Sequence, residues 1–200
     1  MPPLSRSELD PDPIAQMRRW YELAVAEAPL AAAMTLATVD EAGIPDARMV
    51  LLKGFDERGL RFFTNYDSAK GEQLSARPSA AVVLYWRELD RQVRARGIVE
   101  RLGEEESDAY FATRARDSQL GAWASPQSRP LASRTELDRA LEQVASRFAT
   151  AEEVPRPAHW GGLRLRPDSI EFWQGQVGRL HDRFLYTRDA AGWTIERLGP

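Results

Sequence analysis

AMTLATVDEAGIPDARMVLLKGFDERGLRFFTN, residues 33–65, is the stretch that indicates the fold class most directly. Three segments rich in β-forming residues, 33–39, 47–55 and 60–65, are separated by the turn signals DEAG (40–43) and DERG (56–59). Strands joined by such short turns pair in the antiparallel sense, because parallel pairing requires a long crossover. The stretch therefore predicts an antiparallel sheet.

The rest of the chain continues the β pattern and adds helices. Further strands are expected at 80–86, 92–102, 160–166, 169–174, 183–188 and 193–198. Helices are expected from Asp12-Pro13 onward, from near Ser68 to before Pro78, over 104–114, and from the capping box SRTE (133–136) to about Thr150. So many short strands indicate a mainly β fold, a barrel with helices packed outside.

Composition narrows the class of protein. The 200 residues fit a single domain over 1–200, in which 43% hydrophobic and 28% charged residues predict a packed core. The Pro- and Asp-rich segment 1–12 is expected to be loose. A net charge of −3 argues against non-specific binding to nucleic acid. The absence of cysteine excludes disulfides and thiolate sites, and two histidines do not make a His-rich metal site.

The sequence shows no targeting or membrane-spanning signal. The N-terminal residues contain no apolar run of signal-peptide type, and the most apolar stretch, 23–39, is interrupted by Glu27 and Pro29. We therefore expect a cytoplasmic protein with no membrane, nucleic-acid or metal partner.

The segment RLHDR (179–183) is the sharpest polar feature. If it is extended, alternation places Arg179, His181 and Arg183 on one face, where their positive groups repel unless an anion or polar ligand lies among them. The alternative is a solvated edge strand whose charges prevent aggregation, and spacing alone favours that alternative.

Three further clusters contain groups that bind phosphate. Tyr110 and Arg114 share a helix face, with Ser118 one turn further if the helix continues. Within RMVLLK (48–53), strict alternation places Arg48 and Lys53 on opposite faces, so they serve one site only through a bulge or at the ends of the strand. The segment TNYDSAK (64–70) leads from a strand to a helix N-terminus. Taken singly, each cluster is weak evidence for a phosphate site, and ordinary surface residues are the favoured explanation.

These clusters together resemble the pyridoxine/pyridoxamine 5'-phosphate oxidase family. The matching stretches are RMVLLK (48–53), FFTN (62–65), RQV (91–93), ARDSQLGAW (115–123), FWQG (172–175) and RLHDRFLY (179–186). They occur in one order over nearly the whole chain. The resemblance implies a split β-barrel homodimer with two FMN sites at the subunit interface. It also implies an organic redox cofactor, which suits a chain without cysteine or metal ligands.

The resemblance assigns roles to individual residues. FMN phosphate would be held by Arg48, Lys70 and, from the partner chain, Gln127 and Ser128. Arg179 and His181 would be catalytic, the first orienting the substrate and the second positioning it or handling a proton. The residues implied to bind FMN are Arg48, Met49, Val50, Leu51, Leu52, Lys53, Phe63, Thr64, Lys70, Gln92, Gln127, Ser128, Trp173 and Arg183. Those implied to bind the substrate are Lys53, Tyr110, Arg114, Ser118, Arg179, Leu180 and His181.

The implied reaction is oxidation of pyridoxamine or pyridoxine 5'-phosphate by O2 to pyridoxal 5'-phosphate, with release of hydrogen peroxide. A related flavin oxidase acting on another ring, such as a phenazine, is the nearest alternative, and a non-catalytic flavin or pyridoxal-phosphate binding protein is another. The chain departs from the family pattern at four positions: Ala69 replaces a common Arg, Gly178 a larger polar residue, Phe63 a common Tyr and Pro126 a frequent Lys. Ala69 removes one phosphate contact, so weaker FMN binding is expected.

Overall fold

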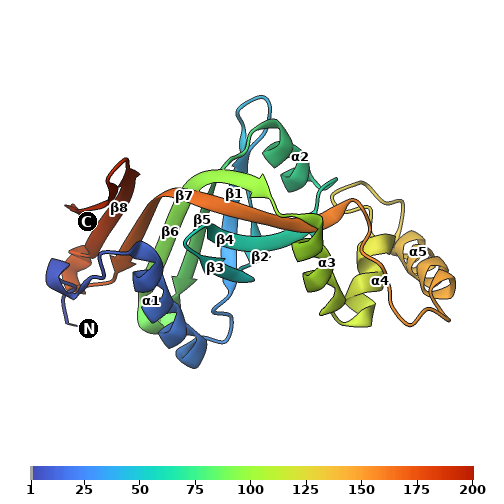
Figure 1. Cartoon of the computed structure of the whole chain (residues 1–200), viewed down its shortest axis with the longest axis horizontal. Coiled ribbons are helices and arrows are strands. Elements are labelled where there is room, and N and C mark those ends of the chain that lie inside the picture. Colours follow the sequence, from blue (N-terminus) through green and yellow to red (C-terminus); the bar gives the residue numbers. More distant parts are fainter. Residues whose placement is uncertain (1) are drawn as a thin grey trace.

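The computed structural model describes residues 2–200. Nine strands in this part of the chain form one antiparallel sheet with the order β2-β1-β5-β6-β7-β4-β3, and β8 and β9 extend it beside β7 (Figure 1). The strands are β1 (Ala33–Val39), β2 (Pro45–Leu51), β3 (Gly54–Asp56), β4 (Gly59–Asn65), β5 (Ser79–Trp86), β6 (Arg91–Arg101), β7 (Trp160–Gln174), β8 (Asp182–Asp189) and β9 (Gly192–Leu198).

The sheet closes into a barrel at Leu52 and Lys53. β2 and β3 stand at opposite ends of the strand order, yet only these two residues separate them in sequence. The Leu52 amide donates to Ala32 O (2.8 Å), whereas the Lys53 amide donates to Arg61 O (2.8 Å). The single strand predicted over 47–55 is therefore wrong, because consecutive amides bond to opposite ends of the sheet.

The long strand β7 organises the rest of the sheet. One edge pairs with β6 along its length, while the other pairs first with β4 and then with β8. Two strands were predicted here, at 160–166 and 169–174. They are one strand because a bulge absorbs the interruption: Gly97 pairs with Pro167 and Arg96 with Ser169, which leaves Asp168 as the extra residue.

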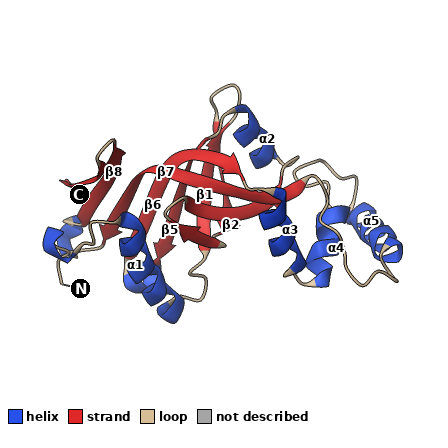
Figure 2. Cartoon of the chain, in the orientation of Figure 1, coloured by secondary structure: helices blue, strands red, loops and turns tan. Residues whose placement is uncertain are grey.

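Helices cover the sheet at two places (Figure 2). α1 (Pro13–Glu27) packs on one face through Trp20, whose ring meets Phe172 edge to face at 5.2 Å. At the far end, α3 (Glu104–Ala112), α4 (Arg116–Ala124) and α5 (Arg134–Arg147) surround a small second core that contains Phe111, Phe148 and Trp160. α2 (Ala69–Ala76) follows β4. The helix predicted over 104–114 ends at Ala112, and α5 ends three residues before the predicted Thr150.

The N-terminal residues pack against the sheet, which corrects the expectation of a loose segment. Leu4 and Leu9 are buried, and the Leu4 amide donates to Asp182 Oδ2 at 2.9 Å. Burial alone would raise the pKa of Asp182, but hydrogen bonds from Arg197, Leu4 and Gln176 lower it instead. The two ends of the chain consequently lie at the same end of the molecule, beside β8 (Figure 1).

Residues 2–200 contain neither a candidate membrane-spanning helix nor a candidate metal site. No helix in residues 2–200 has the length and apolar character to span a bilayer. Nor do His, Asp or Glu side chains gather there in threes as a metal site requires.

Candidate functional site

A cavity of about 480 Å³ opens where the barrel seam meets the helical end of the molecule. Six segments contribute to its wall: the end of β2, the seam, β4, α2, the junction of α3 and α4 with the loop after them, and the start of β7. The lining residues are Met49, Val50, Leu51, Lys53, Phe63, Thr64, Asn65, Lys70, Tyr110, Arg114, Ala115, Ser118, Gln127 and Trp160. We call this the cation-lined cavity.

All the described charged side chains that line this cavity are positive. Lys53, Lys70 and Arg114 line it, and no carboxylate does among the described residues. Burial and the nearby Arg48 lower the pKa of Lys70, and burial lowers the pKa of Arg114. Grouped cations without a counter-charge repel one another, and a bound anion removes that penalty. The cavity is therefore built for an anionic ligand.

Tyr110, Arg114 and Ser118 reach the cavity from a helix junction rather than from one helix face. Tyr110 lies in the last turn of α3, Arg114 in the turn that follows, and Ser118 in the first turn of α4. Thr113 Oγ1 donates to Tyr110 O at 2.8 Å where α3 ends. The helix does not continue from Tyr110 to Ser118, but all three residues line one cavity.

Lys70 lies at the N-terminus of α2. Ser68 caps this helix, and Lys70 Nζ is 3.1 Å from Ser68 Oγ and 2.8 Å from Gln127 Oε1. Gln127 was expected from the partner chain, but the same chain places it here, because the loop after α4 runs beside α2. Ser128 is exposed with a left-handed φ of 67° and does not line the cavity.

Two other expected FMN residues do not line the cavity. The Arg48 guanidinium bonds to Thr38 Oγ1 (2.5 Å), Gln73 Oε1 (2.9 Å) and Asp46 Oδ2 (2.5 Å). Leu52 is buried in the main core, 3% exposed. The neighbours Met49, Val50, Leu51 and Lys53 do line it. The break between β2 and β3 accounts for this placement of Lys53.

A second group of predicted residues lies at the opposite end of β7. Gln92 of β6, Trp173 of β7 and Arg183 of β8 are direct neighbours across three strands. The His181 ring lies 4.6 Å from the Trp173 ring. Gln92, Trp173, Arg179, His181 and Arg183 are called the Trp173 group below.

The polar contacts of the Trp173 group fix two of its side chains. Arg183 Nε donates to Glu171 Oε1 at 2.8 Å, and this bond raises the pKa of Arg183. The second Glu171 oxygen accepts from Arg94, and the carboxylate is buried. The backbone N–H of Gln176 donates to His181 Nδ1 (3.2 Å), so the neutral His181 ring carries its proton on Nε2.

The condition under which Arg179, His181 and Arg183 would share one strand face is not met, because residues 179–181 precede the strand. Val177, Gly178 and Arg179 form a short 3₁₀ turn, in which Gly178 (φ 71°) and Arg179 (φ 62°) are left-handed, and β8 begins only at Asp182. Gly178 suits this turn because a left-handed backbone favours glycine. Val177 (95% exposed) and Leu180 (71% exposed) flank Arg179 in solvent. We refer to Val177–Leu180 as the 177–180 turn.

The cation-lined cavity and the Trp173 group lie far apart within one chain. Trp160, at the start of β7, lines the cavity, whereas Trp173 is near the end of this 15-residue strand. A strand rises about 3.3 Å per residue, so the two ends of β7 are up to roughly 45 Å apart. Figure 1 shows α3 and α4 at one end of β7 and β8 at the other. A single ligand cannot touch both groups of one chain.

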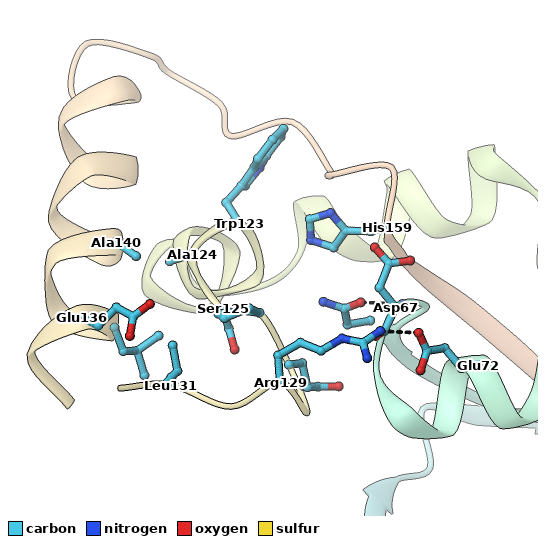
Figure 3. Close-up of a pocket in the computed structure, with 14 residues that line it drawn as sticks. Asp67, Glu72, Trp123, Ala124, Ser125, Arg129, Leu131, Glu136, Ala140 and His159 are labelled. Carbon is cyan, nitrogen blue, oxygen red and sulfur yellow. Dashed lines mark hydrogen bonds and ion pairs between the residues drawn. The ribbon is translucent and has the colours of Figure 1, made fainter. Parts of the chain in front are cut away.

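A neighbouring hollow of about 510 Å³ has a different character (Figure 3). It lies between α5, the end of α4 and the start of α2, and its lining includes Asp67, Glu72 and Glu136. Its arginine, Arg129, is already paired with Glu72. The carboxylates make this hollow a poorer place for an anion than the cation-lined cavity.

Comparison with known proteins identifies the family. Residues 22–148 match the family described as Pyridoxamine 5'-phosphate oxidase, and residues 160–200 match the Pyridoxine 5'-phosphate oxidase C-terminal dimerisation region. The chain belongs to the pyridoxamine 5'-phosphate oxidase family. The second match contains most of the Trp173 group, and the first contains every residue of the cavity except Trp160.

Named relatives support this membership. Pyridoxine/pyridoxamine 5'-phosphate oxidases of Burkholderia mallei (strain SAVP1) and Burkholderia pseudomallei (strain K96243) are 54% identical, covering 98% of this chain and 93% of theirs. PhzG from Burkholderia lata 383, solved with tetrahydrophenazine-1-carboxylic acid, has a TM-score of 0.91 and 30% identity, covering 100% of this chain and 99% of that one. A pyridoxamine 5'-phosphate oxidase-related, FMN binding protein from Nostoc punctiforme shares the fold (TM-score 0.74, 22% identity, 92% and 96% coverage). The predicted split-barrel class is confirmed.

Several residues at these sites were not predicted from the sequence, and Trp160 and Glu171 are the two that matter most to the argument. Trp160 lines the cavity, and Glu171 holds Arg183. A signal for Glu171 was present: it is a lone carboxylate in the otherwise apolar run IEFW (170–173). No comparable local signal marked Trp160, because its contacts come from segments far away in sequence.

Proposed function

We propose that this protein is an FMN-dependent oxidase that converts pyridoxamine 5'-phosphate or pyridoxine 5'-phosphate to pyridoxal 5'-phosphate, with O2 as electron acceptor and hydrogen peroxide as by-product. With the amine substrate, water is also consumed and ammonia is released. One observation carries the proposal: a cavity lined by three cations, a phenol and two aliphatic hydroxyls, with no carboxylate among the described residues. Such a set of donors suits phosphate esters, which carry close to two negative charges at neutral pH.

The cavity residues divide between two phosphates. Lys70, the N-terminus of α2 and Gln127 form one cluster, which suits the FMN phosphate because helix N-termini attract anions. Lys53, Tyr110, Arg114 and Ser118 form the other, and we assign it to the substrate phosphate. Gripping this phosphate fixes the position of the substrate ring and its reacting carbon, which removes much of the entropic cost of the reaction.

The donor set fits FMN. When bound, FMN supplies a two-electron acceptor that takes hydride from the exocyclic carbon of the substrate and is reoxidised by O2. Met49, Val50 and Leu51 offer the cavity an apolar edge for a flat ring, and Thr64 adds a hydroxyl. Arg48 lies near enough to Lys70 to lower the pKa of that lysine, but its guanidinium is bonded to Asp46, so we do not assign it to the phosphate.

The Trp173 group completes the site from a second copy of the chain. Because one chain holds its two groups at opposite ends of β7, a partner must bring Arg179 and His181 to the cavity. Arg179 would orient the substrate, and the Nε2–H of His181 would donate a hydrogen bond to it. The exposed 177–180 turn suits insertion into another subunit, because two of its four side chains are apolar.

An open sheet face supplies the contact between subunits. α1 covers the face that carries Phe172, so the opposite face, which carries Trp173, is left open. Direct strand neighbours extend that face to Tyr85, which is exposed. Exposed apolar residues on a continuous face indicate an interface. Together with the dimerisation-region match at 160–200, this supports a homodimer with two sites at its interface.

PhzG provides a second candidate function. Its structure contains tetrahydrophenazine-1-carboxylic acid, and a carboxylate would also be attracted by the cations of this cavity. Lys53, Tyr110, Arg114 and Ser118 line one cavity, and four donors suit the three free oxygens of a phosphate ester better than the two of a carboxylate. The 54% identity to pyridoxine/pyridoxamine 5'-phosphate oxidases, against 30% to PhzG, favours the same choice.

Aerobic turnover of the FMN-loaded protein tests the proposal. Pyridoxamine 5'-phosphate, pyridoxine 5'-phosphate, unphosphorylated pyridoxamine and tetrahydrophenazine-1-carboxylic acid are compared by aldehyde absorbance, where an aldehyde forms, and by peroxide release. We expect turnover of the two phosphates only. Arg114→Gln should raise KM for them about 10- to 100-fold, because it removes a charge-assisted hydrogen bond. Oxidation of the phenazine acid alone would favour the second function, and no turnover of any compound would make the protein a binding module.

A further inference from the structure

We propose that Trp160 is the positioning residue that presents the Arg114 guanidinium to the substrate phosphate. This inference rests on the proposed function, which assigns that phosphate to Arg114. Trp160 is the first residue of β7, and it touches the cavity without supplying a charge.

Arg114 needs an external support, because its own segment offers little. It lies in the turn between α3 and α4, outside both helices. Its Nη1 is buried without a hydrogen-bond partner in the part of the chain that the structure describes. Its Cζ lies 4.5 Å from the centre of the Trp160 ring and 5.5 Å from that of Phe111. The aromatic faces, chiefly Trp160, hold this guanidinium.

An aromatic partner, unlike a carboxylate, holds an arginine without cancelling its charge. Arg48, Arg156 and Arg183 are each paired with an acid, which cancels charge and occupies their N–H donors. The face of an indole attracts a cation through its quadrupole and accepts no in-plane N–H bond. Arg114 is therefore held in place while its charge is not cancelled, and its N–H donors are not occupied, by an acid among residues 2–200.

Trp160 is itself rigidly placed. It is 7% exposed, pairs with Asn65 across the β4–β7 ladder, and packs edge-on against Phe111 at 5.1 Å. Its ring is nearly parallel to that of Tyr110 (6° between planes, 6.2 Å), and Phe63 stacks on Tyr110 at 3.8 Å. Tyr110 and Arg114, two donors for the same phosphate, are thus fixed by one aromatic stack.

The expected effect is specific to phosphate. Trp160→Leu removes the π face but keeps an apolar side chain, so affinity for a phosphorylated ligand should fall about 3- to 30-fold, the size of a partly buried cation–π interaction. Affinity for the same ligand without phosphate should change little. Trp160→Phe retains a weaker π face, so its effect should lie between wild type and Trp160→Leu.

Equilibrium titration of the FMN-loaded protein measures this directly. Pyridoxal 5'-phosphate and pyridoxal are titrated separately while the flavin absorbance is followed, and the ratio of the two Kd values isolates the phosphate. The ratio is determined for wild type, Trp160→Phe, Trp160→Leu, Arg114→Gln and the Arg114→Gln/Trp160→Leu double variant. In the Arg114→Gln background, Trp160→Leu should leave the ratio unchanged, because the group that Trp160 positions is gone.

The outcomes distinguish failure of the proposed function from failure of the positioning role of Trp160. A wild-type ratio near one would refute the proposed function itself. The positioning role would be refuted if the wild-type protein favours the phosphorylated ligand and Trp160→Leu leaves this Kd ratio unchanged. It would also be refuted if Trp160→Leu lowers the ratio by the same factor in the Arg114→Gln background. Equal loss of affinity for both ligands would indicate a general packing defect and also refute it. If circular dichroism shows that Trp160→Leu does not fold, Trp160→Phe is used in its place. A Kd ratio for Trp160→Phe equal to that of the wild type would then overturn the inference.

Discussion

Lys70 shows how the surroundings of one residue change its chemistry. Its ammonium lies near the capped start of α2, against Gln127, and burial together with Arg48 lowers its pKa below the ordinary value of a lysine. An anion binds the protonated form. Because the pKa of Lys70 is lowered, anion affinity should begin to fall at a lower pH than it would if this lysine were exposed.

We predict that FMN affinity of the apoprotein decreases as the pH rises through this lowered pKa. Loss of the Lys70 proton should increase the Kd for FMN about 10-fold, the size of one charge-assisted hydrogen bond, since the FMN phosphate is already dianionic above its own pKa of about 6. Fluorescence titration of FMN at fixed ionic strength measures the Kd. Lys70→Arg, which stays charged, is the matched control and should show a flatter profile. Identical profiles for the two proteins would show that another group titrates.

At the scale of elements, the strand β7 connects the two halves of the molecule. Its continuity depends on one close approach: Gly97 of β6 faces the backbone at Arg166, where a Cβ would lie 2.0 Å from the carbonyl oxygen. Pro167 in the sequence suggests a break between two strands. The bulge beside Gly97 removes the conflict, and only pairing with β6 reveals it.

Gly97→Ala should therefore destabilise the protein. The backbone at the bulge must shift to admit the methyl group, at a cost of about 1–3 kcal/mol or more, which lowers Tm by several degrees for a chain of this size. Gly121→Ala in α4 is the control, because a Cβ there meets nothing within 4 Å and alanine favours helix. Thermal unfolding followed by circular dichroism compares the two. Equal Tm values would mean that the β6–β7 bulge relaxes freely.

The α3–α4 junction is another element that local sequence does not reveal. Thr113, Arg114 and Ala115 contain no helix breaker, so the sequence is compatible with one continuous helix. The Gln119 side chain of α4 donates to Phe111 O at 2.9 Å and so satisfies a carbonyl at the end of α3. A tertiary hydrogen bond from the next helix thus helps to stabilise the turn that exposes Arg114.

At the scale of the whole molecule, the separation of the two residue groups is the basis for proposing an active site shared by two chains. In the proposed homodimer, each chain would supply a cation-lined cavity to one site and a Trp173 group to the other. Such isologous exchange is the usual symmetry of a homodimer. Damage to one group should therefore be rescued by a partner in which that group is intact.

We predict subunit complementation between Arg114→Gln and Arg179→Ala. Each variant alone should have low activity, whereas co-refolded mixtures should recover about one quarter of the wild-type sites, because half of the dimers are mixed and each has one undamaged site. Turnover of pyridoxamine 5'-phosphate measures the recovery. A mixture of Lys53→Met and Arg114→Gln is the control, because both changes fall in the same group and no site escapes damage. Recovery in the control, or none in the test mixture, would contradict a site shared between chains.

Sequence alone determined the antiparallel β class, the barrel with outer helices and most of the cationic and hydroxyl residues that line the cavity. Alternation, turn residues and caps are local properties of the chain, so 33–39, 60–65 and the helix that begins at Pro13 could be placed directly. Tertiary structure alone decided that Lys53 leaves its strand at the barrel seam, that Arg179 stands in a left-handed turn, and that Trp160 supports Arg114. These depend on pairing and packing between segments far apart in sequence, which no local pattern encodes.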